Sequence, residues 1–384
     1  MNNYLSRQTI PLRAAWPLWF IGLAMIGITC ASTRADQAPA AAAARFAPNP
    51  KLDLPDTTAV DLGPFDWERP EGEPFSGAVT DYSGMVYDMH NHRVLLFGGG
   101  HAATYTDAIY SFDLATLKWS ALYKPTPRKY YTKENLDRGF WKSGDSQDYP
   151  RPVGRHTYDL LVVPDDQPGL WMLMNGVGPS MVAPGFGYFG GAAGHYDFKT
   201  GRWKILPKCP FGGYGGVSEY DPVSKQILGT TGQVVWFYDP QTGASKQILE
   251  NITDLHKVSG YSGTMIYFPP DEKFYTIPQN KKVWSLQLNR ADLTKSTITP
   301  LKPAGSCPES ECAFAYDAKN KIIGGGVKDD SFYVYDPAKN AWLSQPINGA
   351  KPGTMTFHCL VYSPVDNAYI FIANKRTWAY RLKK

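Results

Sequence analysis

The chain has 384 residues, of which 43% are apolar and 14% aromatic, so it can bury a large core and is not a disordered chain. Its 36 glycines and 31 prolines suit many tight turns and exclude a coiled coil. Because 39 basic and 35 acidic residues leave a net charge of only +4 with no long basic run, we expect no nucleic-acid partner.

The N-terminus has the features of an export segment. Arg7 and Arg13 precede an uncharged apolar stretch, 14–31, and small residues suited to cleavage follow it. We therefore expect a signal peptide over 1–35 and a secreted or periplasmic protein. An uncleaved anchor is the alternative, in which case only this segment contacts a membrane. The Ala- and Pro-rich residues that follow predict a flexible linker over 36–56.

If Cys30 is removed with the signal peptide, four cysteines remain, and an even number permits two disulfides in an exported protein. Cys307 and Cys312 are close enough in sequence to close a small loop. Reduced, buried thiols are the alternative. The sequence contains no Cys-x-x-Cys motif, so the cysteines do not predict a zinc site.

A hairpin unit recurs through the rest of the chain. An aspartate precedes a tryptophan by six positions in Asp113–Trp119, Asp197–Trp203 and Asp336–Trp342, and a fourth copy at Asp239 keeps the turn but lacks the tryptophan. Alternating aromatic residues before each aspartate, followed by turn-forming residues, predict a strand, a tight turn and a second strand.

A second hairpin lies upstream of each of these units. Its anchor positions are Tyr87, Pro164, Tyr220, Tyr267, Tyr316 and Tyr362. Four strands per unit of about 45–50 residues are typical of propeller blades. We therefore predict one all-β propeller over 57–384 with six four-stranded blades, seven being the alternative. Since the sixth repeat lacks its fourth strand, we expect 57–67 to supply it and close the ring.

The repeats also resemble a known family. Gly-Gly runs end a second strand at 98–100 and 324–326, a Tyr-rich third strand follows, and the fourth strand carries a Trp. Over 78–384 this pattern resembles kelch repeats, the units of the galactose oxidase central domain. The resemblance implies a kelch-type propeller and no particular activity. The copper–radical chemistry of galactose oxidase is not expected, because no motif supplies its Cys–Tyr cross-link and its set of Tyr and His residues.

Propeller topology indicates which residues share a face. The loop between strands two and three of a blade and the connection to the next blade lie on one face, here called the top face. Two long insertions, 124–154 and 177–194, extend loops of this face and are rich in aromatic residues. Such loops usually carry function. We therefore expect ligand-binding residues over blades one and two, namely Tyr105, Trp141, Tyr188 and His195.

Polar residues that can do chemistry fall on the same face. The catalytic candidates are His101, Arg155, His156 and Tyr158. Alternation along a strand places His156 and Tyr158 on one side and Arg155 on the other. Either the first two face the ligand and Arg155 braces the adjoining blade, or the assignment is the reverse. A metal site formed by the histidines is not expected, because they lack the short spacing typical of zinc ligands, and no cofactor is expected.

Two functions fit these residues. The first is binding of a glycan or protein ligand on the top face, with a polysaccharide or cell-surface glycan as the partner. The second is a polysaccharide lyase that acts by β-elimination on a uronate. In that case Arg155 would neutralise the carboxylate, His101 or His156 would take the proton, and a tyrosine, Tyr158 or Tyr105, would protonate the leaving oxygen.

Overall fold

The computed structural model describes residues 45–74, 77–99, 104–177, 189–207, 209–211, 216–231, 233–250, 252, 263–278, 281–307 and 313–384. The predicted signal peptide, 1–35, lies outside these residues, as do His101, Tyr188 and Cys312. The described elements are β-strands and three short 3-10 helices, η1 (Pro50–Leu52), η2 (Arg128–Tyr130) and η3 (Leu293–Lys295), so the fold class is all-β, as predicted. Within the described ranges, no helix is long and apolar enough to span a bilayer.

Four antiparallel sheets have four strands each. Their strands are, in chain order, β9 (Leu161–Val162), β10 (Gly169–Met172), β13 (Gly194–Asp197) and β14 (Arg202–Ile205); β15 (Val217–Asp221), β16 (Gln226–Thr231), β17 (Val234–Tyr238) and β18 (Ser245–Leu249); β19 (Thr264–Phe268), β20 (Lys273–Ile277), β21 (Trp284–Gln287) and β22 (Thr297–Pro300); and β23 (Phe314–Asp317), β24 (Ile322–Lys328), β25 (Ser331–Asp336) and β26 (Ala341–Pro346).

The largest sheet has nine strands in the order β27-β1-β30-β29-β28-β2-β3-β4-β5. Its strands are β1 (Thr58–Pro64), β2 (Gly84–Asp88), β3 (Arg93–Phe97), β4 (Tyr110–Asp113), β5 (Lys118–Ala121), β27 (Asn348–Gly349), β28 (Met355–Ser363), β29 (Ala368–Ala373) and β30 (Arg376–Arg381). One parallel residue pair, Gly84 with His358, joins β2 to β28. The edge strand β27 also pairs in parallel, with β1, and the remaining neighbours are antiparallel.

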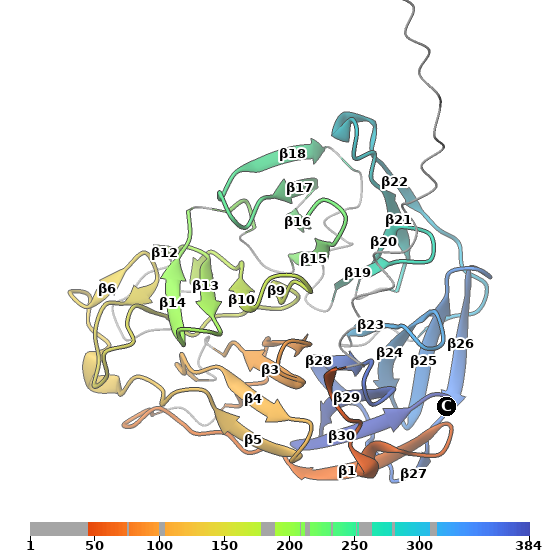
Figure 1. Ribbon diagram of the computed structural model, residues 1–384, viewed down its shortest axis with the longest axis horizontal. Coiled ribbons are helices and arrows are strands. Elements are labelled where there is room, and N and C mark those ends of the chain that lie inside the picture. The colour runs from red at the N-terminus through yellow and green to blue at the C-terminus, as the bar shows by residue number, and fades with distance from the viewer. Residues whose placement is uncertain are drawn as a thin grey trace, which may run out of the picture.

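The sheets surround a common centre (Figure 1). The first strands β9, β15, β19, β23 and β28 lie nearest to it, and β5, β14, β18, β22 and β26 lie at the rim. Each first strand contacts the first strand of the next sheet, and β28 contacts β2. Apolar residues fill the spaces between the sheets and form the core. This arrangement is compatible with a β-propeller.

The predicted hairpins are present, and one local interaction repeats in them. Phe112, Tyr196 and Tyr335 each lie directly opposite the tryptophan of the following strand, with ring centroids 5.2–5.4 Å apart. The aspartate that follows each aromatic residue accepts backbone N–H groups of the turn, as Asp113 does from Thr116 at 2.7 Å. The six-residue spacing therefore sets both the turn and the cross-strand ring pair.

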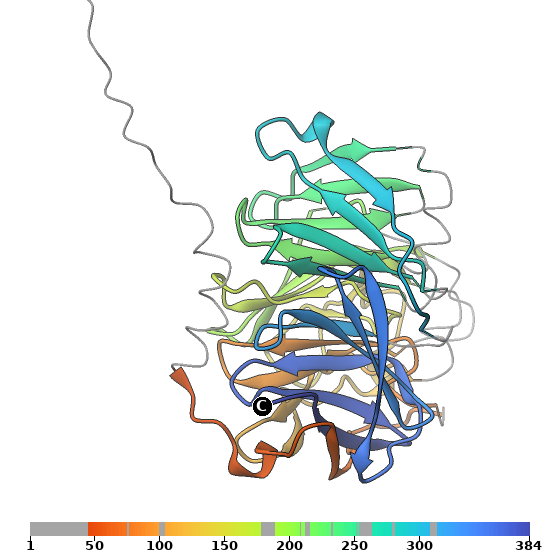
Figure 2. The same ribbon diagram turned by 90° about the vertical axis from the view of Figure 1, so that its right-hand side faces the viewer.

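The N-terminal strand lies beside the last strand of the chain. β1 pairs antiparallel with β30 from Thr58, opposite Arg381, to Pro64, opposite Arg376. The N–H of Thr57 donates to Leu382 O at 3.1 Å. Figure 1 accordingly shows β1 alongside β30, near the C-terminus, and Figure 2 shows the same ribbon from the side.

Part of the segment predicted as a flexible linker, 36–56, is packed. Leu52 is fully buried, and the Asn49 side chain donates to Leu114 O at 2.7 Å. The guanidinium of Arg381 donates to Leu52 O at 2.9 Å and to Asp53. Residues 49–54 therefore belong to the folded domain, and the domain boundary expected at residue 57 lies too late.

The insertion at 124–154 forms a small sheet of three strands, β6 (Leu136–Asp137), β7 (Phe140–Trp141) and β8 (Arg151–Pro152). The second insertion is bounded by β11 (Gly176–Val177) and β12 (Phe189–Gly190), which pair with each other.

Candidate ligand-binding site

An aromatic and imidazole cluster lies where three neighbouring first strands begin. Tyr82 precedes β2, His156 and Tyr158 precede β9, and Phe357 lies within β28. His156 Nδ1 is 3.0 Å from the Tyr158 hydroxyl, a hydrogen bond in which either group can donate. The ring of Tyr82 stacks on the imidazole with centroids 4.3 Å apart. The structure therefore brings the predicted pair His156 and Tyr158 together, and it adds Tyr82 and Phe357.

Three members of this cluster have strained backbones. The φ angles are +60° at Tyr82, +46° at Tyr158 and +32° at Phe357, in the left-handed region that aromatic residues rarely adopt. Hydrogen bonds stabilise the backbone at Tyr82 and Tyr158, because the N–H groups of Thr157 and Tyr158 both donate to Tyr82 O, at 3.0 and 3.1 Å. Non-glycine residues in such conformations cluster at functional sites, because only a surrounding structure that determines them can maintain them.

The cluster has an outer and an inner layer. Tyr82 and Phe357 are half-buried, with ring centroids 4.8 Å apart, whereas His156 and Tyr158 are buried. The two half-buried rings are thus an aromatic platform, with a hydrogen-bonded imidazole and phenol behind it. Such a combination of apolar surface and a few positioned polar groups is what small-molecule sites contain.

Arg155 does not point to this cluster. Its guanidinium is fully buried and donates to the backbone carbonyls of Val153, Met174, Ala192 and Gly139, at 2.9 to 3.1 Å for the first three. Burial lowers the pKa of Arg155 to about 9. These bonds tie the first insertion to the sheet of β10 and β13. Of the two alternatives, Arg155 therefore braces the scaffold, and its donors are engaged by the backbone.

Tyr105 and Trp141 pack inside the first insertion. The Trp141 ring stacks on the Tyr131 ring with centroids 4.6 Å apart. Tyr105 contacts the Tyr131 ring edge-on, with centroids 5.6 Å apart. Trp141 is fully buried and Tyr105 is 3% exposed. These two residues, predicted as ligand contacts, are core residues of the insertion, because its strands are too short to be stable without their own apolar core.

His195 lies at a different place. It is on β13 directly opposite Trp171 of β10, and the two rings stack with centroids 4.0 Å apart. Burial lowers the pKa of His195. It lines an outer cavity of about 750 Å³, together with Arg138 and Lys204, that His156 and Tyr158 do not line. The structure therefore does not bring His195 to the His156 cluster.

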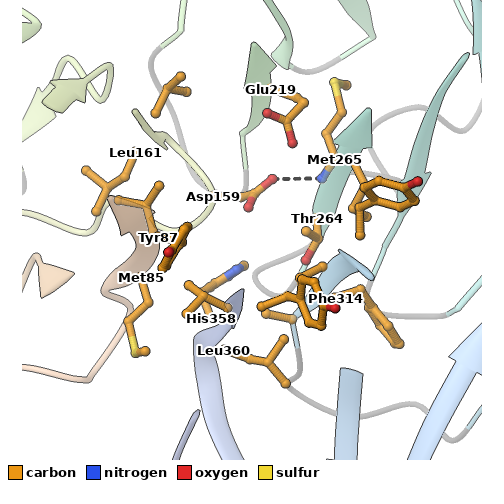
Figure 3. Close-up of a pocket in the computed structure, with 18 of the residues that line it drawn as sticks. Met85, Tyr87, Asp159, Leu161, Glu219, Thr264, Met265, Phe314, His358 and Leu360 are labelled. Atoms are coloured by element: carbon orange, nitrogen blue, oxygen red, sulfur yellow. Dashed lines mark hydrogen bonds between the residues drawn. The ribbon is translucent and has the colours of Figure 1, made fainter. Parts of the chain in front are cut away.

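A central cavity of about 260 Å³ is lined by the first strands β2, β9, β15, β19, β23 and β28. Asp159, Glu219, Thr264 and His358 face this space (Figure 3). The Tyr158 ring meets the edge of His358 with centroids 5.9 Å apart, so the cavity adjoins the aromatic cluster. Burial raises the pKa of Asp159 well above its ordinary value and that of Glu219 to about 7.

The sequence analysis missed both carboxyl groups. Asp159 directly follows Tyr158, and Glu219 is an acidic residue inside a strand whose neighbours are buried. An acidic residue at an otherwise buried strand position was the available signal, because ionised groups are rarely buried without a reason. In the described part of the chain, no three His, Cys, Asp or Glu residues are placed to hold a metal ion.

Comparisons with known proteins identify no family. No protein-family profile matches the chain. No curated protein matches it either. Two solved structures from Bacteroides thetaiotaomicron are similar in shape, both with a TM-score of 0.49. One is a structural genomics protein of unknown function that is 11% identical; the match covers 84% of this chain and 75% of that protein's chain. The other is an auxiliary nutrient binding protein, 12% identical, covering 87% and 74%. Neither similarity indicates a function for this chain.

Proposed function

We propose that the protein is an exported, kelch-type propeller of six blades that binds a glycan on its top face. Two observations support the blade number. The nine-stranded sheet is joined across its middle by a single residue pair, which divides it into two four-stranded units and the edge strand β27. The cyclic contacts of the first strands, from β2 to β28 and back to β2, support a ring that β1 closes.

The aromatic platform of Tyr82 and Phe357 carries the proposal of glycan binding. A sugar ring has an apolar face that packs on aromatic side chains, and its hydroxyl groups need hydrogen-bond partners when they lose water. The half-buried rings supply the first. The buried, hydrogen-bonded His156–Tyr158 pair lies behind them and holds the Tyr82 ring in position by stacking. Strain at three of these residues supports a functional rather than a merely structural origin.

The geometry favours binding over β-elimination. A lyase must neutralise the uronate carboxylate before the neighbouring proton becomes acidic. Arg155 was the candidate for that role, and its guanidinium is engaged by four backbone carbonyls instead. Tyr105, one of the two candidate acids, lies in the core of the insertion.

Calorimetric titration of the soluble protein with oligosaccharides tests the proposal. The probes are oligomers of β-linked glucose, of N-acetylglucosamine and of galacturonate. We expect at least one to bind, and Tyr82→Ala and Phe357→Ala to weaken that binding at least tenfold. Leu343→Ala, at an exposed position on β26, is the control and should leave the affinity unchanged.

Two outcomes contradict the proposal. If Tyr82→Ala and Phe357→Ala keep full affinity for a bound oligosaccharide, the platform is not the site. If the galacturonate oligomer develops near-ultraviolet absorbance during incubation, unsaturated sugars are forming and the protein is a lyase rather than a binding module.

A further inference from the structure

The central cavity is separate in chemistry from the aromatic platform. Its walls carry both polar and apolar side chains, and the apolar ones include Met85, Leu161, Met265, Phe314 and Leu360 (Figure 3). Its volume of about 260 Å³ lies just below the ~300–1,000 Å³ of typical ligand pockets. A cavity of this size and lining has room for a small ligand with an apolar part.

Two carboxyl groups face this space without a cationic partner. Asp159 Oδ2 accepts the N–H of Met265 at 2.7 Å, and Glu219 Oε1 accepts the N–H of Tyr220 at 2.8 Å. Among the ion pairs of the described residues, none includes Asp159 or Glu219. Both residues are half-buried, and a carboxylate that is partly removed from water is stabilised by a nearby cation, because loss of hydration is costly to its charge.

A third polar group in the cavity also lacks a partner. Thr264 is 4% exposed, and its hydroxyl oxygen makes no hydrogen bond within the part of the chain that the structure describes. It comes from β19, whereas Asp159 precedes β9 and Glu219 is on β15. Leaving a buried hydroxyl unsatisfied costs about 1–3 kcal/mol, so a polar ligand group at this position is favoured.

We propose that the central cavity binds a small primary ammonium ion that carries a short apolar chain. The ammonium group donates up to three hydrogen bonds, which Asp159, Glu219 and Thr264 can accept. The apolar chain packs against the methionine and leucine side chains, and the aromatic ring of Phe314 is available to the cation. The site does not depend on glycan binding, because it shares none of the platform residues.

The chemistry of the walls selects an organic cation over a metal ion. Hard metal ions take several oxygen ligands, and among the described residues no three His, Cys, Asp or Glu side chains are placed to hold a metal ion. The raised pKa of Glu219, about 7, has burial as its main cause, and a bound cation would favour the ionised carboxylate.

Calorimetric titration of the full chain tests this proposal. The probes are n-butylammonium chloride and its neutral isostere n-butanol, at matched ionic strength. We expect saturable binding of n-butylammonium with one site, and at least tenfold weaker binding of n-butanol. Glu219→Gln and Thr264→Val should each weaken n-butylammonium binding, the first at least tenfold. Leu343→Ala is the control that should retain it.

Asp159→Asn is not the main variant, because the Asp159 carboxylate also holds the backbone of Met265. Thermal melts verify that Glu219→Gln and Thr264→Val fold. Absence of n-butylammonium binding, equal affinity for n-butanol, or full affinity in folded Glu219→Gln would each overturn the proposal. None of these results bears on the Tyr82 and Phe357 platform, so the two proposals fail separately.

Discussion

Arg155 places a guanidinium in the interior between the first insertion and the sheet of β10 and β13. Four backbone carbonyls surround it, and the Phe140 ring lies 5.6 Å from its central carbon. The fully buried Arg155 side chain supplies hydrogen bonds to these carbonyls, so it is needed for the local fold. A cation next to His156 in the sequence is thus directed away from the candidate site.

Replacing Arg155 with methionine should destabilise the protein by about 3–5 kcal/mol, the cost of breaking a buried polar network. Urea denaturation measures the effect. Arg138→Met is the matched control, because the Arg138 side chain is 61% exposed, and it should change stability by less than about 0.5 kcal/mol. An Arg155→Met protein of unchanged stability that has lost ligand binding would instead assign Arg155 to the site.

Glu219 makes stability depend on pH in a defined direction. Its pKa rises from an ordinary 4.5 to about 7 on folding, so between these values the folded protein holds a proton that the unfolded chain releases. The unfolded state then binds fewer protons, and the stability of the folded state falls as the pH rises from 4.5 to 7. Asp159 acts in the same direction, since burial also raises its pKa.

Glu219→Gln removes one of these two contributions. The variant should gain stability relative to the unmodified protein as the pH rises from 4.5 to 7, by up to about 2–3 kcal/mol. Urea denaturation at a series of pH values gives this difference, from which the contribution of Asp159 cancels. Two curves that stay parallel over that range would show that Glu219 titrates normally.

At the scale of the elements, β1 is the strand whose partner is most distant in sequence. It pairs with β30 at six positions and also with β27. Around it, Arg376 Nε lies within ion-pair distance of Asp61, and Asn348 donates to Thr57 at 2.8 Å. β1 therefore covers the edge of β30, which would otherwise present unpaired backbone groups.

Deletion of 51–67 should lower the thermal midpoint by more than about 10 °C, because it removes β1, η1 and the buried Leu52 together. Differential scanning calorimetry measures the midpoint. A chain that begins at residue 45 is the control, since it keeps every described contact of this segment. A deleted protein that melts like this control would argue against ring closure by β1.

At the scale of the whole molecule, the cavity and the platform both lie where first strands from different sheets meet. The platform and the His156–Tyr158 pair behind it take residues that precede or lie in β2, β9 and β28, and the cavity adds β15, β19 and β23. A closed ring of sheets would hold these residues in place without the long loops of the top face. This is consistent with a rigid scaffold that supports a site on its axis.

The predicted export can be tested on the same protein. Arg7, Arg13 and the apolar stretch 14–31 predict that the mature chain starts within or just after 31–35. Mass spectrometry of the protein recovered outside the cytoplasm should find a new N-terminus there. A recovered chain that begins at Met1 and sediments with membranes would support the uncleaved anchor.

The sequence by itself determined the features that depend on neighbouring residues. The six-residue spacing from Asp113 to Trp119 predicts a hairpin because the turn and the ring pair form within one short segment. Alternation along a strand placed His156 and Tyr158 on one side; the two side chains do hydrogen-bond, but residues 155–158 precede β9, so a turn and not strand alternation brings them together. The same reasoning could not place His195 or Trp141 correctly, because burial depends on what packs over a strand and not on the strand's own pattern.

Only the tertiary structure decided which distant residues share a space. Asp159 precedes β9, Glu219 lies on β15 and Thr264 on β19, and no local pattern relates them; they line one cavity because the first strands surround a common centre. Leu52 is buried because it packs in an apolar cluster with residues far along the chain, such as Val94 and Ala379, and Arg381 donates to its carbonyl. Arg155 turns inward because carbonyls of Met174 and Ala192 need a donor. In each case the deciding energy is the burial and pairing of groups that come together only in the folded chain.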